Sequence, residues 1–168
     1  MIRCQGKLST TSDKVSLDSA AVCGLPEPQE DHALRMTKFA SECLHKMDSL
    51  VVGLVDSLGQ ETADLKLRVG IHSGPTTAGV LRGQKSRFQL FGDTVNTAAR
   101  MESNGSPGAI HISQATADLL MNKHGKKHWI KKREGGSIQV KGKGQMQTYW
   151  VMHHQNNHGN SNQPNEQR

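Results

Sequence analysis

An amide and a guanidinium stand four residues apart in the most informative stretch of this sequence, residues 87–103. The first residues of the stretch alternate apolar and polar as a short strand does, and a helical pattern follows with Asp93 as a candidate N-cap. Because positions four apart share a helix face, Asn96 and Arg100 are expected to project together. Helix N-termini favour anions and an arginine fork suits phosphate, so the pattern predicts a phosphate-handling site.

A lone Asn/Arg pair is more often part of a solvated helix face, but this pair belongs to one of four blocks of sequence. The blocks are Gly-Leu-Pro-Glu-Pro at 24–28, Leu-Arg-Val-Gly-Ile-His-Ser-Gly-Pro at 67–75 with Ala-Gly-Val at 78–80, Phe-Gly-Asp-Thr-Val-Asn-Thr-Ala-Ala-Arg-Met-Glu-Ser at 91–103, and Val-Lys-Gly-Lys-Gly at 140–144 before Thr-Tyr-Trp at 148–150. In this order they closely resemble the catalytic domain of the class III adenylate and guanylate cyclases.

The resemblance implies conversion of GTP or ATP to the 3′,5′-cyclic nucleotide with release of pyrophosphate, in intracellular signalling. By position, Asn96 resembles the asparagine that orients the ribose, and Arg100 the arginine that stabilises the transition state. Lys141 resembles the lysine that binds the terminal phosphates, and Gln89 lies where the family reads the purine. Because a glutamine amide both donates and accepts hydrogen bonds, the choice between GTP and ATP stays open.

The family holds two Mg²⁺ or Mn²⁺ ions with two aspartates, and neither aspartate motif is present in this sequence. Asp18 lies close to one of the two positions, but its neighbours do not match and the spacing is one residue short. We therefore assign no metal ligand in this chain and expect the chain alone to be weak or inactive as a cyclase. We favour the C-terminal part of an ordinary cyclase; the alternative is a half-site partner or regulatory pseudo-cyclase that pairs, as a homodimer or heterodimer, with a metal-competent domain.

Composition excludes some other classes of protein. The formal net charge of +6 is concentrated between Lys123 and Lys143. Such a cluster is usually a solvated surface, and an aromatic content of 4% argues against a module that stacks nucleic-acid bases, so no specific nucleic acid is expected. An odd number of cysteines without close pairs favours a reducing, cytoplasmic location, or the cytosolic part of a membrane-bound cyclase; no apolar run is long enough to span a bilayer.

Apolar periodicity outlines the elements that must position these residues. Residues 1–18 show no period and are expected to be disordered, residues 19–152 form the domain, and 153–168 read as a low-complexity tail. Helices are predicted at 31–58, 93–103 and 113–121, and strands at 19–24, 65–71, 87–91, 109–112, 129–130, 137–140 and 148–152. This order predicts an α/β sandwich with helices on one face of a sheet. The resemblance implies a ferredoxin-like βαββαβ cyclase core, N-terminally truncated, that works as a dimer.

Overall fold

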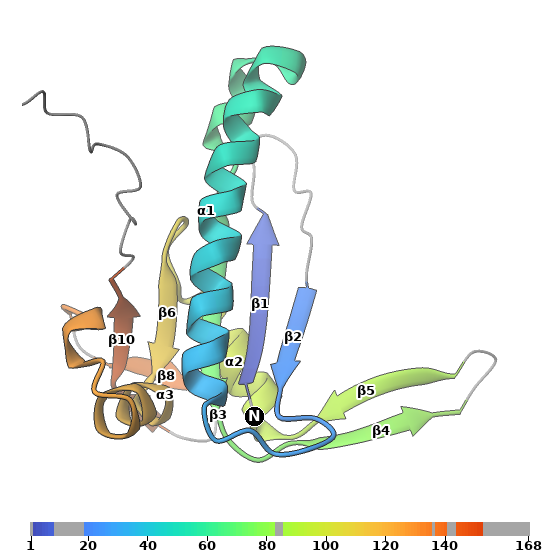
Figure 1. Cartoon of the computed structure of the whole chain (residues 1–168), viewed down its shortest axis with the longest axis vertical. Coiled ribbons are helices and arrows are strands. Elements are labelled where there is room, and N and C mark those ends of the chain that lie inside the picture. Colours follow the sequence, from blue (N-terminus) through green and yellow to red (C-terminus); the bar gives the residue numbers. More distant parts are fainter. Residues whose placement is uncertain (1, 9–18, 83–85, 136, 141–143, 153–168) are drawn as a thin grey trace, which may run out of the picture.

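The computed structural model of the chain describes residues 2–8, 19–82, 86–135, 137–140 and 144–152 (Figure 1). The strands are β1 (Ile2–Leu8), β2 (Ser19–Cys23), β3 (Leu67–Ser73), β4 (Thr77–Leu81), β5 (Arg87–Phe91), β6 (Ile110–Ser113), β7 (Ile130–Lys132), β8 (Ile138–Val140), β9 (Gly144–Met146) and β10 (Thr148–Val151). The α-helices are α1 (His32–Leu58), α2 (Asp93–Ser103) and α3 (Gln114–Asp118), and shorter helical turns are η1 (Gln60–Asp64), η2 (Leu119–Lys123) and η3 (Lys127–Trp129).

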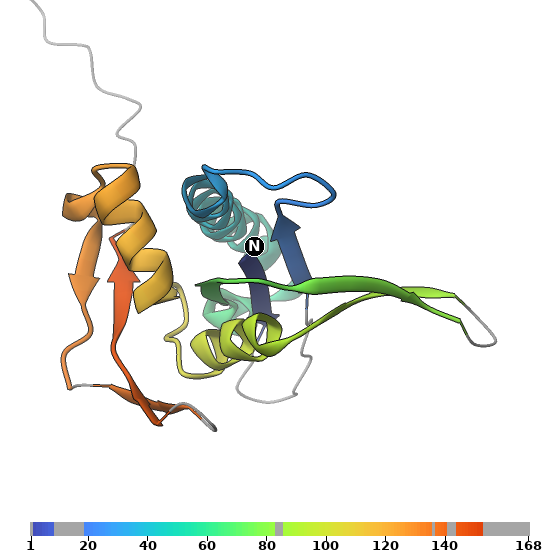
Figure 2. The ribbon, with the colours of Figure 1, turned by 90° about the horizontal axis from the view of Figure 1, so that it is seen from below.

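Six of the strands form one sheet in the order β2-β1-β3-β6-β10-β7. All neighbours in this sheet are antiparallel except β3 and β6, which are parallel and pair Gly70 with His111. The strands β4 and β5 form a separate hairpin that extends away from the main sheet, and β8 and β9 form a second hairpin (Figures 1 and 2). The mixed α/β fold predicted from the sequence is confirmed.

The sheet is covered by helices on both faces, so the prediction of helices on one face was wrong. Figure 2 shows α1 and α2 on opposite sides of β1. The alternation of β3 explains the two layers, because successive side chains of a strand point to opposite faces. Val69 and Ile71 pack in the core with α1, whereas the backbone at Gly70 contacts α2. Sequence periodicity identifies the apolar face of a helix but not the side of the sheet that receives it.

The main core lies between α1 and the sheet and also includes residues of α3, η2 and β10. Its buried members are Ala33, Met36, Ala40, Leu44, Val69, Ile71, Ile110, Ile112, Ala117, Leu120 and Val151. A smaller cluster, made of Met101 and Ile138 with the half-buried Met146, joins α2 to the β8–β9 hairpin. This second cluster attaches the C-terminal hairpin to the helix that carries Asn96 and Arg100.

Three strands were not predicted from the sequence: β1, β4 and β9. Disorder had been expected for residues 1–18, and this was wrong for Ile2–Leu8, whose Cys4 lies opposite Ala21 of β2 and Ile71 of β3. Backbone pairing with two neighbours holds such a strand in place without a side-chain period. Residues 9–18 and the predicted tail at 153–168 lie outside the described residues.

The basic segment that begins at Lys123 is partly neutralised. Lys123 lies 3.3 Å from a carboxylate oxygen of Glu30, which is distant in sequence, and Lys131 lies 2.8 Å from Glu134. The Lys126 ammonium lies 4.9 Å from the centre of the Trp129 ring. These contacts fit a solvated surface, as the sequence predicted. No helix among the residues that the structure describes is both long and apolar enough to cross a membrane.

Candidate functional site

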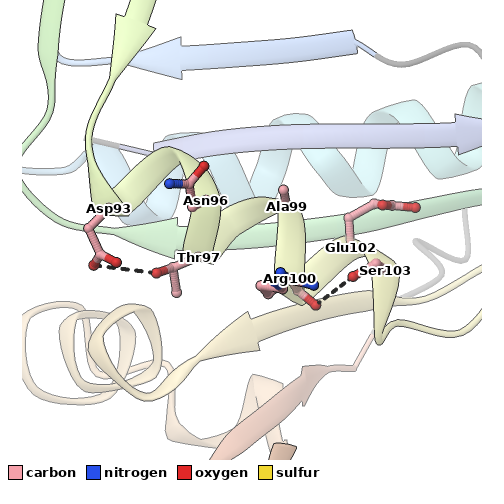
Figure 3. A pocket seen from close by; sticks show the side chains of 7 residues that line it. All are labelled: Asp93, Asn96, Thr97, Ala99, Arg100, Glu102 and Ser103. Carbon is pink, nitrogen blue, oxygen red and sulfur yellow. Dashed lines mark hydrogen bonds between the residues drawn. The ribbon is translucent and has the colours of Figure 1, made fainter. Parts of the chain in front are cut away.

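A groove of about 530 Å³ runs along α2 (Figure 3). Asn96 and Arg100 both line it, and their joint projection and their roles stay predictions. Both side chains are exposed. The other lining residues are Asp93, Thr97, Ala99, Glu102 and Ser103.

The start of α2 is set by a glycine. Gly92 has φ 120°, in the left-handed region that favours glycine, and it turns the chain from β5 into the helix within one residue. Asp93 is therefore the first helical residue rather than the N-cap that was predicted. Its carboxylate accepts a hydrogen bond of 3.5 Å from the Thr97 hydroxyl and adds negative charge to the first turn, which the helix dipole favours (Figure 3).

The opposite side of α2 lies very close to β3. A side chain at Gly70 would overlap the backbone of Ala98 and Glu102, so only glycine allows the helix to approach the sheet to this distance. The buried stripe consists of Thr94, Thr97, Ala98, Met101 and Glu102, whereas Val95 and Ala99 are half-buried. This close packing fixes the distance between β3 and the helix that carries the groove.

One member of the buried stripe carries a charge. The Glu102 side chain is 5% exposed, and its Oε1 lies 3.2 Å from Nε of Arg68, whose side chain is 20% exposed. A buried carboxylate is tolerated when an opposite charge lies beside it. Glu102 therefore couples α2 to β3 electrostatically at the groove, which it also lines.

The C-terminal turn of α2 is bound by the strands of the sheet. Nδ1 of the fully buried His111 lies 2.7 Å from the Met101 carbonyl oxygen, and Nη1 of Arg133 donates to the Asn104 carbonyl oxygen at 2.9 Å. Burial lowers the pKa of the His111 imidazole; the Met101 carbonyl opposes this shift and the positive charge of Arg133 adds to it. The ring is therefore held in its neutral form, with Nδ1 as the donor.

The remaining predicted site residues are not brought to this groove. Gln89 lies on β5, opposite Gly79 of β4, and is not among the residues that line the groove. Lys141 and Asp18 fall outside the described residues. The sequence reasoning also missed Thr97 and Ser103 as lining residues, although the helical spacing from Asn96 and Arg100 would have identified Ser103.

A second, smaller hollow lies at the start of α2. It has a volume of about 420 Å³ and is formed by the loop after β3 and the turn after β5. His72 lines it, but its Nδ1 lies 2.7 Å from the hydroxyl oxygen of Ser113, which in turn lies 3.3 Å from that of Thr116. This buried hydrogen-bond network is typical of a histidine with a structural role.

Two divalent cations require a cluster of carboxylate oxygens, and the groove does not provide one. Only Asp93 and Glu102 contribute carboxylates to it, and Glu102 is paired with Arg68. Across the part of the chain that the structure describes, no group of three or more His, Cys, Asp or Glu side chains is arranged to hold a metal ion. The residues present therefore do not fit a two-metal site.

The fold defines the class of protein. It is the fold of nucleotide cyclase domains, because the chain matches the guanylate cyclase domain of RhGC from Catenaria anguillulae, solved in complex with GTP, with a TM-score of 0.68 and 28% identity over 89% of this chain and 94% of that chain. The adenylyl cyclase CyaB from P. aeruginosa has the same fold, with a TM-score of 0.67, 24% identity, and coverage of 92% of this chain and 75% of that chain.

The chain belongs to the adenylate and guanylate cyclase catalytic domain family, whose model matches residues 18–153. It is 45% identical to the receptor-type guanylate cyclase gcy-28 of Caenorhabditis elegans over 130 residues, which are 77% of this chain and 10% of the relative. It is 40% identical to the soluble guanylate cyclase subunit beta-2 of Rattus norvegicus over 136 residues, 80% of this chain and 18% of the relative. The chain thus spans between a tenth and a fifth of these relatives.

Proposed function

We propose that this chain supplies the asparagine and arginine of a nucleotide cyclase site that a second cyclase domain completes. The reaction is conversion of GTP or ATP to the 3′,5′-cyclic nucleotide with release of pyrophosphate. The observation that carries the proposal is the shared groove of Asn96 and Arg100 on α2, in a chain of the cyclase family.

The two side chains suit different parts of the reaction. The guanidinium of Arg100 is always charged and can donate two parallel hydrogen bonds to phosphate oxygens, which gain negative charge as the ribose 3′-oxygen attacks the α-phosphorus. The amide of Asn96 can both donate to and accept from a ribose hydroxyl and so orient the attacking oxygen. Removal of one group that stabilises transition-state charge typically costs on the order of 100- to 1,000-fold in rate. Lys141 completes the proposal as the group that binds the terminal phosphates.

The proposal places the ligands of the metal ions outside the described residues. Mg²⁺ or Mn²⁺ ions supply Lewis-acid chemistry and charge neutralisation in such reactions. Because the groove carboxylates do not fit a two-metal site, the proposal takes the metal ligands from the partner domain. The chain alone is then weak or inactive.

We propose GTP as the preferred substrate. The relatives gcy-28, gcy-13 and soluble subunit beta-2 are named as guanylate cyclases, and they are 45%, 44% and 40% identical to this chain. Gln89 is proposed to lie against the purine once the partner is bound, and its amide can form hydrogen bonds with either purine edge. Receptor-type and soluble relatives both support a domain that works on the cytosolic side of the membrane.

The β4–β5 hairpin is the proposed contact with the second domain. A two-stranded hairpin has little stability of its own in water, and this one exposes large apolar side chains. The exposed residues are Val80, Leu81, Phe88 and Phe91. One related solved domain is described as a non-canonical dimer and another as monomeric.

The test is complementation. The 168-residue chain is mixed with a metal-competent cyclase domain whose own asparagine and arginine have been replaced, and cyclic GMP and cyclic AMP are measured with Mg²⁺ or Mn²⁺. We expect product only in the mixture, and a decrease in kcat of about 100- to 1,000-fold for Arg100→Gln. Asn96→Ala should also lower kcat. Failure of the mixture to form either product would contradict the proposal.

Two matched controls separate the site from general effects of substitution. Arg35→Gln removes an arginine on α1 whose side chain is 61% exposed, and Asn122→Ala removes an exposed asparagine on η2. Neither residue lines the groove. Both controls should retain the activity of the unsubstituted chain. An equal loss of activity in the controls would show that the effect is not specific to the residues of α2.

A further inference from the structure

The C-terminal end of α2 needs partners outside the helix. The last carbonyl groups of any helix lack intrahelical donors, and a buried carbonyl without a partner costs about 1 to 3 kcal/mol. The Arg100 carbonyl accepts from the Asn104 N–H at 3.1 Å. The Gly105 N–H would donate to the Met101 carbonyl oxygen if the helix continued, but it donates to the backbone carbonyl oxygen of Glu102 at 2.8 Å instead.

His111 of β6 fills the place that Gly105 leaves. Its Nδ1 lies 2.7 Å from the Met101 carbonyl oxygen, and the ring is fully buried. Because a carbonyl oxygen only accepts, Nδ1 carries the proton and the imidazole is fixed in one tautomer. Its Nε2 has no hydrogen-bond partner among the residues that the structure describes, so this ring makes its single polar contact with the helix next to Arg100.

Two further side chains complete the contact. Trp150 of β10 pairs with His111 across the sheet, and the two rings lie 4.6 Å apart at an angle of 31°. The guanidinium of Arg133 lies 5.6 Å from the Trp150 ring centre, and its Nη1 donates to the Asn104 carbonyl at 2.9 Å. The backbone N–H of Arg133 donates to Thr148, which fixes its own position beside β10. A cation at this end of a helix also complements the helix dipole.

We propose that His111, Trp150 and Arg133 form a clamp that positions Arg100 for transition-state stabilisation. The proposal rests on the proposed cyclase function and extends it to residues that do not line the groove. The clamp binds the carbonyls of Met101 and Asn104, which bracket the last turn of the helix on the C-terminal side of Arg100. A displacement of about 1 Å at a reacting group can cost on the order of 100-fold in rate, so the clamp acts on kcat rather than on nucleotide binding.

The test uses variants that keep the shape of the clamp and remove one donor. His111→Phe retains a ring to stack on Trp150 and loses the hydrogen bond, whereas His111→Asn restores a side-chain N–H close to the position of Nδ1. Arg133→Gln removes the cation from a half-buried site, and Lys132→Gln removes an exposed cation from the adjacent position as the control. Circular dichroism and thermal unfolding identify any variant that does not fold.

In the complementation mixture we expect kcat to fall about tenfold for His111→Phe and Arg133→Gln, with KM unchanged. His111→Asn should recover most of the loss, and Lys132→Gln should match the unsubstituted chain. A rise in KM with kcat unchanged, or an equal loss of kcat for Lys132→Gln, would overturn the clamp.

Two measurements on the isolated 168-residue chain test the clamp independently of catalysis. The imidazole ¹⁵N shifts of His111 should show a protonated Nδ1 and an unprotonated Nε2. Amide hydrogen exchange at Asn104 and Gly105 should accelerate at least about threefold in His111→Phe and in Arg133→Gln. Unchanged amide exchange, or a His111 ring protonated on Nε2 instead of Nδ1, would contradict the clamp. If the mixture that contains the unsubstituted chain forms no cyclic nucleotide, the proposed function is contradicted instead.

Discussion

Arg68 of β3 and Glu102 of α2 form an ion pair at the groove, with 3.2 Å between Nε of Arg68 and Oε1 of Glu102. The contact joins the sheet to the helix that bears Asn96 and Arg100, and it lies where the Glu102 side chain is almost fully buried. Its two partners are separated by more than thirty positions in the sequence, and the chain between them includes the β4–β5 hairpin. The pair therefore fixes a long-range relationship on which the groove depends.

Replacement of Glu102 should destabilise the domain. Glu102→Ala leaves Arg68 without its buried counter-charge, and removal of one partner of a buried pair costs about 3 kcal/mol. Glu134→Ala is the control, because the Lys131–Glu134 pair is exposed and should make no measurable difference. Urea unfolding followed by circular dichroism measures both. Equal midpoints for the two variants would show that the buried pair contributes nothing special.

A methyl group at Gly70 should displace α2. The added Cβ would overlap the backbone of Ala98 and Glu102, so we expect Gly70→Ala to lower the free energy of unfolding by about 3 kcal/mol. Gly53 lies inside α1 with open space around it, and Gly53→Ala should raise that free energy by about 0.5 to 1 kcal/mol. Thermal unfolding of the two variants should thus shift in opposite directions; a tolerated Gly70→Ala would mean that the close approach of helix and sheet is dispensable.

The stability of the domain should fall as the pH is lowered through the ordinary pKa of histidine. Burial lowers the pKa of His111 in the folded chain, so below about pH 6.5 the unfolded chain binds a proton that the folded chain does not. The charged groups on the neighbouring elements are Arg133, which opposes protonation, and the Arg68–Glu102 pair. The stabilisation is therefore complete above that pH and is lost below it.

His111→Asn isolates this effect, because the partly buried His32, whose pKa is also lowered, is present in both proteins. Urea midpoints at about pH 7.5 and about pH 5.5 should decline more for the unsubstituted chain than for His111→Asn. Parallel declines would assign the pH dependence to other groups.

Removal of an exposed aromatic side chain from the β4–β5 hairpin should weaken association between cyclase domains. Phe88 is 64% exposed and lies opposite Val80, so Phe88→Ser removes apolar surface from the proposed contact without opening the core. We expect the dissociation constant to rise about tenfold or more. Sedimentation velocity over a range of concentrations measures it, and Phe39→Ser on α1, at 45% exposure, is the control. A monomeric unsubstituted chain, or equal effects of both substitutions on the dissociation constant, would contradict the proposal that the hairpin forms the interface.

The sequence allowed much of the fold to be predicted, because the elements with strong periodicity are also those that bury a face. The amphipathic helix at 31–58 is found as α1 at His32–Leu58, and Gly59 ends it with φ 98°. The helix predicted at 113–121 is found as α3 followed by η2, and the side chain of its N-cap Ser113 accepts from the Thr116 N–H. By contrast, β4 contains Ala78 and Gly79 and is exposed along much of its length, so no apolar alternation identified it.

The candidate site was predicted only in part, for a comparable reason. Asn96 and Arg100 were found because helical spacing acts within one element. The contacts that hold their helix come from β3, β6 and the residue after β7, and no local pattern links Gly70, Arg68 or His111 to α2. The burial of Glu102 in particular depends on the charge of Arg68, which lies 34 positions earlier in the sequence.

Gly92 is the single residue between the last position of β5 and the first position of α2. The projecting hairpin therefore joins the groove helix without an intervening loop, and the Thr94 hydroxyl also donates to the carbonyl oxygen of Pro75, two residues before β4. If binding of a partner along the hairpin changes the orientation of Asn96, then by thermodynamic reciprocity a nucleotide that orders the groove strengthens the binding of that partner by the same factor.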